Sequence, residues 1–223
     1  MSRREYTGMV LLDLQKAFDT VDHTILCNKL QAMGIGSVDC FRSYLTNRTQ
    51  RVKIDEIESE SMNITCGVPQ GSILGPLLFL CYVNDMILSV NCKLMLYADD
   101  CVLLVSGRDP NVISDTLSKN LESCQKWLVD NRLSLHLGKT ESLLFGSKRK
   151  LQAAENFQIK CDSTDISAVP VVKYLGLKLD TTLSGEDIIE SVVNKSTSRL
   201  KFLYRQAGSL TAETKKTLCQ TLV

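Results

Sequence analysis

Histidine is scarce in this sequence, with two among 223 residues, and no two of the nine cysteines stand at Cys-x-x-Cys spacing. Structural zinc sites need four Cys or His ligands, usually in such closely spaced pairs. The composition therefore argues against a zinc site. Several of the cysteines lie inside apolar runs, as reduced core thiols do. This predicts a reducing compartment and hence an intracellular protein, of the nucleus or the cytoplasm.

Long apolar runs are missing as well. The longest one, Ile73 to Val83, contains Gly75 and Pro76 and has only eleven residues, whereas a transmembrane helix needs about 20. The first residues of the chain lead into a short apolar stretch that does not resemble a secretory signal peptide. We therefore expect no membrane partner.

Neither sign of charge dominates, because the net charge is +1. The content of 44% hydrophobic and 23% charged residues is ordinary for a folded protein. The charge is nevertheless uneven, with a balance of −3 over residues 1–138 and +4 over residues 139–223. This division suits a carboxylate–metal centre beside a surface that follows phosphates, although ordinary variation in surface charge explains it equally well.

The periodicity of the apolar residues predicts an α+β fold. Helical spacing is found over residues 24–33, 38–45, 73–86, 111–131, 188–204 and 211–223. Alternating or continuous apolar runs predict strands over residues 9–12, 50–55, 63–66, 94–96, 102–105, 133–137, 141–145 and 171–179. This order is typical of helices packed on one face of an antiparallel sheet.

An Asp-Asp pair, Asp99 and Asp100, joins the two β-prone runs 94–96 and 102–105. The pattern predicts a hairpin with both carboxylates at its tip. Two like charges in such a place are unfavourable without a counter-charge, which a divalent cation would supply. The alternative is an ordinary polar turn, since Asp is common in turns.

A third carboxylate, Asp13, ends the apolar strand 9–12. If that strand pairs with the Asp99–Asp100 hairpin in one sheet, the three carboxylates converge. Two-metal phosphoryl transfer needs such oxygen ligands to hold two Mg²⁺ ions about 3.5–4 Å apart. The alternative role for Asp13 is the N-cap of a helix over residues 14–18.

The stretch from Gly67 to Gly71 predicts a tight loop before a long apolar helix, with Ser72 as the expected N-cap. Gln70 offers an amide for polar contacts, and Gly71 lets a base or sugar approach closely. The ring of Phe18 is placed to form a wall beside a sugar. An ordinary turn and an ordinary core phenylalanine remain the alternatives.

Three basic residues are candidates for contacts with phosphate. Lys139 follows the predicted strand 133–137 and could neutralise a leaving pyrophosphate. Lys195 and Arg199 share one face of the helix 188–204 and could follow a phosphate backbone. A solvated surface is the alternative for each of them.

Together these stretches resemble the reverse transcriptase domain of non-LTR (LINE-type) retrotransposons, in order and spacing, over nearly the whole chain. The stretches LLDLQKAFDTVDH (11–23), GVPQGSILGP (67–76) and YADD (97–100) look like the first three catalytic motifs of that family. Residues 133–140, including Lys139, resemble the fourth motif, and KYLG (173–176) resembles the primer grip.

The resemblance implies a role for each candidate residue. Asp13 and Asp99 would ligate two Mg²⁺ ions, which Mn²⁺ could replace, and Asp100 would support the metal site. Lys139 would assist the departure of pyrophosphate. Phe18 would disfavour a ribose 2′-OH on the incoming dNTP, and Gln70 and Gly71 would contact template and nucleotide. The residues implied to bind the DNA primer and the RNA template are Tyr97, Tyr174, Leu175, Gly176, Lys195 and Arg199.

The fold implied is a right-hand polymerase palm, an antiparallel sheet backed by helices, with part of the fingers and a partial helical thumb. We expect the palm with residual fingers elements over 1–182 and the start of a truncated thumb over 183–223. In the family a basic fingers segment precedes the first motif, whereas twelve residues precede Asp13 here. Further fingers or endonuclease segments of a parent polyprotein are therefore expected partners.

The function implied is RNA-directed DNA synthesis by nucleotidyl transfer from a dNTP to a primer 3′-OH. One alternative is a truncated or domesticated retroelement remnant that binds RNA or protein without polymerising. Another is a different palm-bearing enzyme such as a nucleotide cyclase, against which the Pro-Gln-Gly loop and the Tyr-Leu-Gly stretch argue.

Overall fold

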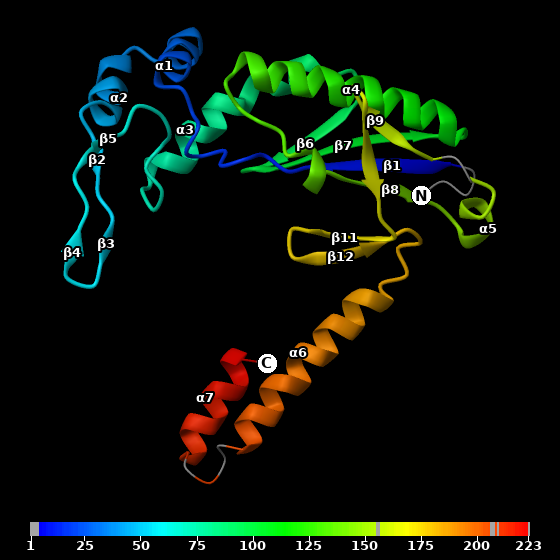
Figure 1. Ribbon diagram of the computed structural model, residues 1–223. Helices are drawn as coiled ribbons and strands as arrows, with labels where there is room; N and C mark the ends of the chain where they lie inside the picture. Colours follow the sequence, from blue (N-terminus) through cyan, green and yellow to red (C-terminus); the bar gives the residue numbers. More distant parts are fainter. Residues whose placement is uncertain (1–4, 155–156, 206–207, 209, 223) are drawn as a thin grey trace. The chain divides into compact units, whose positions relative to one another are not determined.

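The computed structural model describes the whole chain except residues 1–4, 155–156, 206–207, 209 and 223. It contains two compact units, one that extends to Val169 and one that begins at Pro170 (Figure 1). The division lies before residues 171–180, which the sequence analysis assigned to the first domain. Those residues therefore pack with the C-terminal part of the chain, while the names palm and thumb stay predictions.

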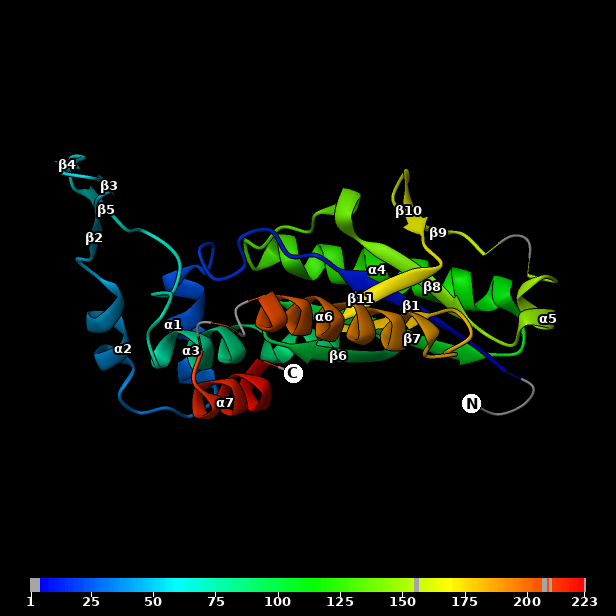
Figure 2. The ribbon, with the colours of Figure 1, turned by 90° about the horizontal axis from the view of Figure 1, so that it is seen from below.

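The first unit is built on a six-stranded sheet with the order β6-β7-β1-β8-β10-β9. The strands are β1 (Tyr6–Leu12), β6 (Lys93–Tyr97), β7 (Asp100–Gly107), β8 (Glu141–Phe145), β9 (Ile159–Cys161) and β10 (Thr164–Ala168). Figure 2 shows β1 between β7 and β8, and it pairs antiparallel with both. The expected antiparallel sheet is confirmed, except that β10 pairs parallel with β8. The sequence analysis missed β9 and β10.

Helices of the first unit include α1 (His23–Ala32), α2 (Val38–Leu45), α3 (Leu74–Val83), the 3₁₀ helix η1 (Asn84–Ser89) and α4 (Pro110–Asp130). Helix α4 packs on strands β1, β7 and β9, whereas α1 packs against α2 and α3. Figure 1 shows α4 along the sheet. Buried apolar side chains of strands and helices form one cluster, which includes Val10, Leu103, Leu26, Phe79 and Leu117. Burial of such apolar surface is the main stabilising contribution to this unit.

Helix α4 approaches the sheet closely at Gly8. A Cβ atom placed on Gly8 would lie 2.5 Å from Ile113 Cγ2 and 2.6 Å from Leu117 Cδ1. The missing side chain therefore allows the helix to lie against the central strand.

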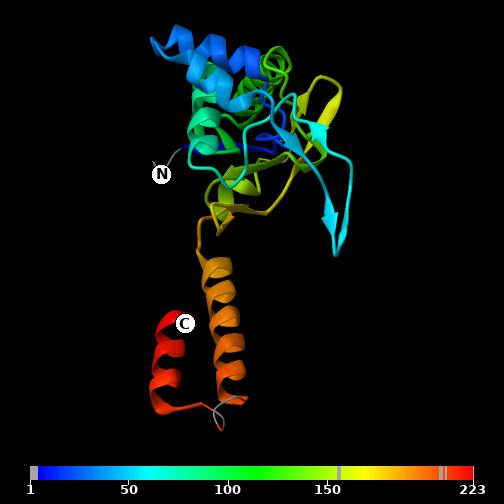
Figure 3. The ribbon, with the colours of Figure 1, turned by 90° about the vertical axis from the view of Figure 1, so that its left-hand side faces the viewer.

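The structure of residues 49–63 differs from the one predicted. A continuous strand over 50–55 with a partner over 63–66 was predicted, but two short ladders form instead. Strand β2 (Thr49–Gln50) pairs with β5 (Met62–Asn63), and β3 (Lys53–Ile54) pairs with β4 (Ile57–Glu58). Figure 3 shows this arm projecting from the rest of the first unit. Without a second layer to cover it, its apolar side chains stay exposed.

The second unit contains the hairpin β11 (Val171–Tyr174) and β12 (Leu177–Asp180), followed by α6 (Glu186–Arg205) and α7 (Ala212–Leu222). Both helices were expected, although Val223 lies outside the described residues. The single strand predicted over 171–179 is wrong, because positive φ angles at Leu175 and Gly176, +47° and +83°, reverse the chain. No described helix has the length and hydropathy needed to span a bilayer.

Candidate active site

The Asp-Asp hairpin forms as predicted. Tyr97 at the end of β6 pairs with Asp100 at the start of β7, so the turn consists of Ala98 and Asp99. Ala98 has a φ of +54°, a left-handed conformation that residues with a Cβ adopt at a cost of roughly 1–2 kcal/mol. The strained turn leaves the side chains of Asp99 and Asp100 exposed at the tip.

Asp13 reaches the same end of the sheet from β1. The ladder between β1 and β7 ends with Leu12 opposite Cys101. The next position in this register places Asp13 opposite Asp100. Although the side chain of Asp100 is exposed, the surrounding protein partly desolvates it, which raises its pKa, and the neighbouring charges of Asp99 and Asp13 raise the pKa further. The three carboxylates therefore lie at the same end of the sheet, while their role as joint metal ligands stays a prediction.

The alternative role for Asp13, a helix N-cap, is wrong. The chain after Asp13 forms turns, and Leu14 makes an isolated antiparallel bridge with Leu135. Main-chain bonds on either side of it, from His136 N to Asp13 O and from Gln15 N to Ser134 O, are 2.8 and 2.9 Å long.

The donor chemistry at this corner fits a divalent cation, because exposed carboxylates repel one another and offer hard oxygen ligands. Among the described residues, however, no group of three or more His, Cys, Asp or Glu side chains is close enough together to hold a metal ion. Mg²⁺ at phosphoryl-transfer sites is usually held by one or two carboxylates together with substrate phosphates. Within the described residues, the carboxylates of this corner alone therefore do not form a complete ligand set for a metal ion.

A cavity of about 420 Å³ opens beside the carboxylates. Its lining includes Asp99, Phe18, Gln70 and Gly71, which the sequence analysis had selected from three separate motifs. Phe18 is half-buried, and its ring centroid lies 4.5 Å from that of Phe79. Phe18 is thus both a packed aromatic residue and a wall of the cavity.

The loop from Gly67 to Gly71 is bound to the segment that follows Asp13. Gly67 N donates to Val21 O over 2.7 Å, and Val68 N donates to Phe18 O over 2.8 Å. Gly67 has a φ of +88°, and a Cβ there would lie 2.8 Å from Asp19 O. Only glycine meets both conditions at this position.

Ser72 was predicted to be the N-cap of the helix α3, and it does bond to a main-chain N–H at the start of that helix, but it lies one position before the N-cap. Its Oγ accepts from Gly75 N over 2.9 Å, as an N-cap side chain does, and donates to Pro69 O over 2.7 Å. The helix itself begins at Leu74, so that Ile73 occupies the N-cap position.

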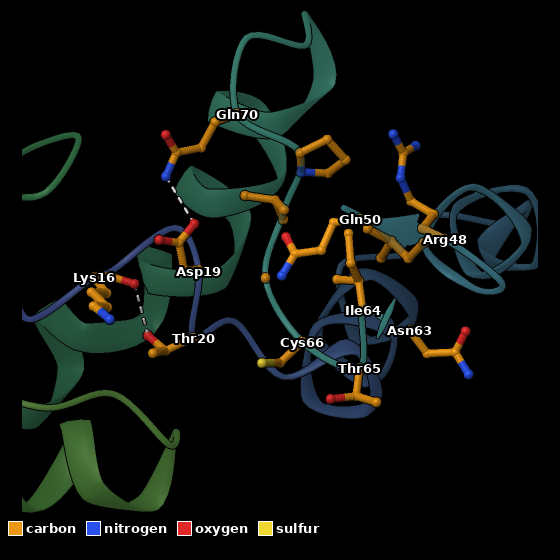
Figure 4. Close-up of a pocket in the computed structure, with 14 residues that line it drawn as sticks. Lys16, Asp19, Thr20, Arg48, Gln50, Asn63, Ile64, Thr65, Cys66 and Gln70 are labelled. Atoms are coloured by element: carbon orange, nitrogen blue, oxygen red, sulfur yellow. Dashed lines mark hydrogen bonds between the residues drawn. The ribbon is translucent and has the colours of Figure 1, made fainter. Parts of the chain in front are cut away.

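A second cavity, of about 620 Å³, shares Lys16, Pro69 and Gln70 with the first (Figure 4). Its polar lining includes Lys16, Asp19, Arg48, Gln50 and Gln70. Lys16 lines both cavities and has a positive φ of +45°. The sequence analysis had not selected Lys16, although it lies between Asp13 and Phe18 in the first motif.

Lys139 lies in a different element from the one expected. Residues 133–137 were predicted as a strand, but only Leu135 bridges another segment, and the 3₁₀ helix η2 (Leu137–Lys139) follows at once. Both edges of β1 are already paired with β7 and β8, so no long edge is left for these residues. Lys139 is exposed and makes no ion pair within the part of the chain that the structure describes.

The residues selected for primer and template contacts fall in both units. Tyr97 is 64% exposed beside the carboxylate turn. Tyr174 ends β11, and Leu175 and Gly176 form the two-residue turn to β12. Lys195 and Arg199 are exposed on α6. These last five residues belong to the second unit, whereas the carboxylates belong to the first.

Comparison with known proteins places these features in a family. The family model described as reverse transcriptase (RNA-dependent DNA polymerase) matches residues 1–179. The chain is 27% identical over 209 residues to the RNA-directed DNA polymerase from mobile element jockey of Drosophila funebris, covering 90% of this chain and 22% of that protein. It is 29% identical over 187 residues to the "Probable RNA-directed DNA polymerase from transposon X-element" of Drosophila melanogaster, covering 81% and 20%. The chain thus spans about a fifth of these relatives.

Among solved structures, apo telomerase from Candida tropicalis is similar, with a TM-score of 0.54 and 15% identity over 80% of this chain and 35% of that one. Telomerase from the same organism with a fragment of telomeric RNA gives a TM-score of 0.53 and 13% identity over 97% and 37%. At these identities the likeness concerns the fold alone.

Proposed function

This chain belongs to the reverse transcriptase (RNA-dependent DNA polymerase) family, and we propose that its carboxylate corner catalyses nucleotidyl transfer from a dNTP to a primer 3′-OH on an RNA template. The observation that carries the proposal is the placement of Asp13 and Asp99–Asp100 at adjoining ends of paired strands, beside a cavity of nucleotide size. The other residues of that cavity come from the first and second motifs.

In this proposal Asp13 and Asp99 hold two Mg²⁺ ions, which Mn²⁺ can replace, and Asp100 supports them. Bound there, the ions would activate the attacking oxygen and neutralise the leaving phosphates. Desolvation is the larger cause of the raised pKa of Asp100, and the negative charges of Asp99 and Asp13 add to it; these neighbouring charges support the assignment, because a site that concentrates negative charge attracts cations.

The chain's own residues orient the substrates. Phe18 forms the wall beside the sugar and excludes a 2′-OH, and Gln70 and Gly71 contact nucleotide and template. Lys139 neutralises the negative charge of the departing pyrophosphate or donates a proton to it. Because the bond-making atoms belong to the substrates, catalysis depends mainly on positioning and charge neutralisation.

The finer anatomy follows from the same proposal. The sheet of the first unit is the palm, the arm 49–63 is part of the fingers, and α6 and α7 begin a thumb. Tyr97, Tyr174, Leu175 and Gly176 bind primer and template, and Lys195 and Arg199 follow the phosphate backbone. The remaining fingers or endonuclease segments of a parent polyprotein would act beside this chain.

Primer extension on an RNA template with Mg²⁺ or Mn²⁺ tests the proposal. Asp13→Asn and Asp99→Asn should each reduce extension at least about a hundredfold, because metal-supported charge stabilisation contributes several kcal/mol. Asp39→Asn, a change at an exposed carboxylate of α2, is the matched control. Full activity of Asp99→Asn would overturn the assignment.

Thermal unfolding gives a measurement that does not need turnover. Mg²⁺ should raise the melting temperature of the wild type more than that of Asp13→Asn or Asp99→Asn, because a ligand that binds only the folded state stabilises it. The alternative function is a non-polymerising retroelement remnant. A wild type that binds primer–template RNA without extending the primer would indicate this alternative.

A further inference from the structure

Two side chains of the segment after Asp13 bind the loop 67–71. The carboxylate of Asp19 accepts a hydrogen bond from Gln70 Nε2 over 2.8 Å (Figure 4). The ring Nε2 of His23 lies 2.7 Å from Gly67 O. These contacts join the two ends of the loop to one short segment, 19–23.

The contact with Asp19 fixes which way the Gln70 amide points. An ionised carboxylate can only accept hydrogen bonds, so the NH₂ group of Gln70 must face Asp19. The amide oxygen Oε1 is then directed elsewhere and stays available as an acceptor. Without Asp19 the amide could rotate by half a turn and exchange its donor and acceptor.

The contact with His23 sets the position of the loop's first residue. A main-chain carbonyl only accepts, so His23 Nε2 must carry the proton and donate it to Gly67 O. His23 is the first residue of α1. The preceding N-cap, Asp22, accepts from Ile25 N over 2.9 Å and pairs with Arg132. His23 is therefore held on a well-anchored helix start.

Phe18 immediately precedes this segment and lines one cavity together with Gln70 and Gly71. The separation between Phe18 and the loop depends on the main-chain bond from Val68 N to Phe18 O and on the two side-chain contacts of the segment 19–23. A change in that separation alters the room for the sugar more than it alters the carboxylates, which lie on the sheet.

We propose that Asp19 and His23 are positioning residues, which fix the loop 67–71 relative to Phe18 and so determine the preference for deoxyribose over ribose at the nucleotide. The sugar preference rests on the proposed function. The positioning itself does not, because it concerns contacts within the free chain.

Hydrogen exchange of the full chain without substrates tests the positioning. Asp19→Ala and His23→Ala should each speed exchange at the Gly67 and Val68 amides about five- to tenfold, as expected for the loss of one supporting hydrogen bond. Asp19→Asn and His23→Gln keep an acceptor and a donor, respectively, and should stay within about twofold of the wild type. Asp39→Ala should leave the loop unchanged. Wild-type exchange in both alanine variants overturns the proposal.

Single-nucleotide extension with dNTP and the matching rNTP tests the sugar preference. Asp19→Ala should lower the ratio of kcat/KM for dNTP over rNTP about fivefold, whereas Asp19→Asn, which can still accept from Gln70, should lower it less. A structural defect would instead lower both kcat/KM values equally. An unchanged ratio in an active enzyme overturns the sugar-preference part. A wild type that does not extend primers contradicts the proposed function, and with it the sugar preference, while the exchange result still decides the positioning.

Discussion

The register of the β1–β7 ladder ends with Leu12 opposite Cys101 and, continued by one position, brings Asp13 opposite Asp100. The negative charge of Asp13 adds to the burial and to the charge of Asp99 that raise the pKa of Asp100. We expect Asp13→Asn to lower the pKa of Asp100 towards its ordinary value without reaching it, because burial is the larger cause. Carboxyl ¹³C titration by NMR in metal-free buffer measures this, with Asp39→Asn as the control. An unaltered Asp100 titration in Asp13→Asn would show that the two groups do not interact.

Gly8 allows α4 to pack on the central strand. We expect Gly8→Ala to reduce the free energy of unfolding by about 1–3 kcal/mol, because the added methyl group would overlap Ile113 and Leu117. Urea denaturation measures the change. Gly36→Ala, where an added Cβ meets nothing within 4 Å, should have little effect. Equal stability of the two variants would mean that the helix moves away at no cost.

Tyr82 connects α3 to the end of α4. Its fully buried hydroxyl donates to Asn131 O over 2.6 Å and accepts from Asp22 N over 3.3 Å. We expect Tyr82→Phe to destabilise the fold by about 1–2 kcal/mol, whereas the same change at Tyr204, which is 84% exposed, should be nearly neutral. Chemical denaturation of both variants provides the comparison.

The same hydroxyl predicts a loss of stability in alkali. Burial raises the pKa of Tyr82 to about 12, above its ordinary value of about 10. The folded state therefore holds this proton more tightly, so the stabilisation is complete below about pH 10 and is lost as the pH rises towards 12. Tyr82→Phe should show a smaller loss between pH 10 and 12 than the wild type. Identical alkaline unfolding curves would contradict the assignment.

Asp180 closes the turn between β12 and α6. Its carboxylate accepts from the main-chain N–H groups of Thr182, Ser184 and Gly185 and from the Thr182 hydroxyl. The Thr182 hydroxyl contributes most to holding the pKa of Asp180 well below its ordinary range, and the main-chain donors add to this. The resulting stability is present above about pH 4 and is lost as the pH falls through the folded-state value.

Asp180→Asn should therefore weaken the second unit by about 1–2 kcal/mol at pH 7 and flatten its acid dependence below pH 4. Helical circular dichroism of the full chain during heating, at several pH values from 7 to 2, measures both effects. Glu190→Gln, a change at an exposed residue of α6, should retain the wild-type acid dependence. Parallel curves for wild type and Asp180→Asn would remove Asp180 as the cause.

The sequence predicted the elements whose pattern is local. The Asp99–Asp100 hairpin and the helix α4 follow from apolar spacing within one stretch, and both are confirmed. Four residues that line the nucleotide-sized cavity had been selected because each belongs to a distinctive motif, namely Phe18, Gln70, Gly71 and Asp99. Their assignment to catalysis and binding stays a prediction.

The sequence could not predict the segments whose structure depends on which other strand or loop is free to pair with them. Residues 133–137 alternate as a strand does, but β1 has no free edge for them. Residues 171–179 read as one apolar run, and only the conformation of Leu175 and Gly176 divides it. The contacts of Asp19 and His23 with the loop have no periodic signal, since they join residues 44 to 51 positions apart.

The central position of β1 has a consequence during protein synthesis. Its first neighbour in the sheet, β7, begins only at Asp100, and its second, β8, begins at Glu141. At typical translation rates of about 5–20 residues per second, β1 leaves the ribosome several seconds or more before either partner exists. The apolar side chains of Val10 and Leu12 stay uncovered in that interval. During that interval the strand that later becomes the middle of the core is open to chaperone binding and to aggregation.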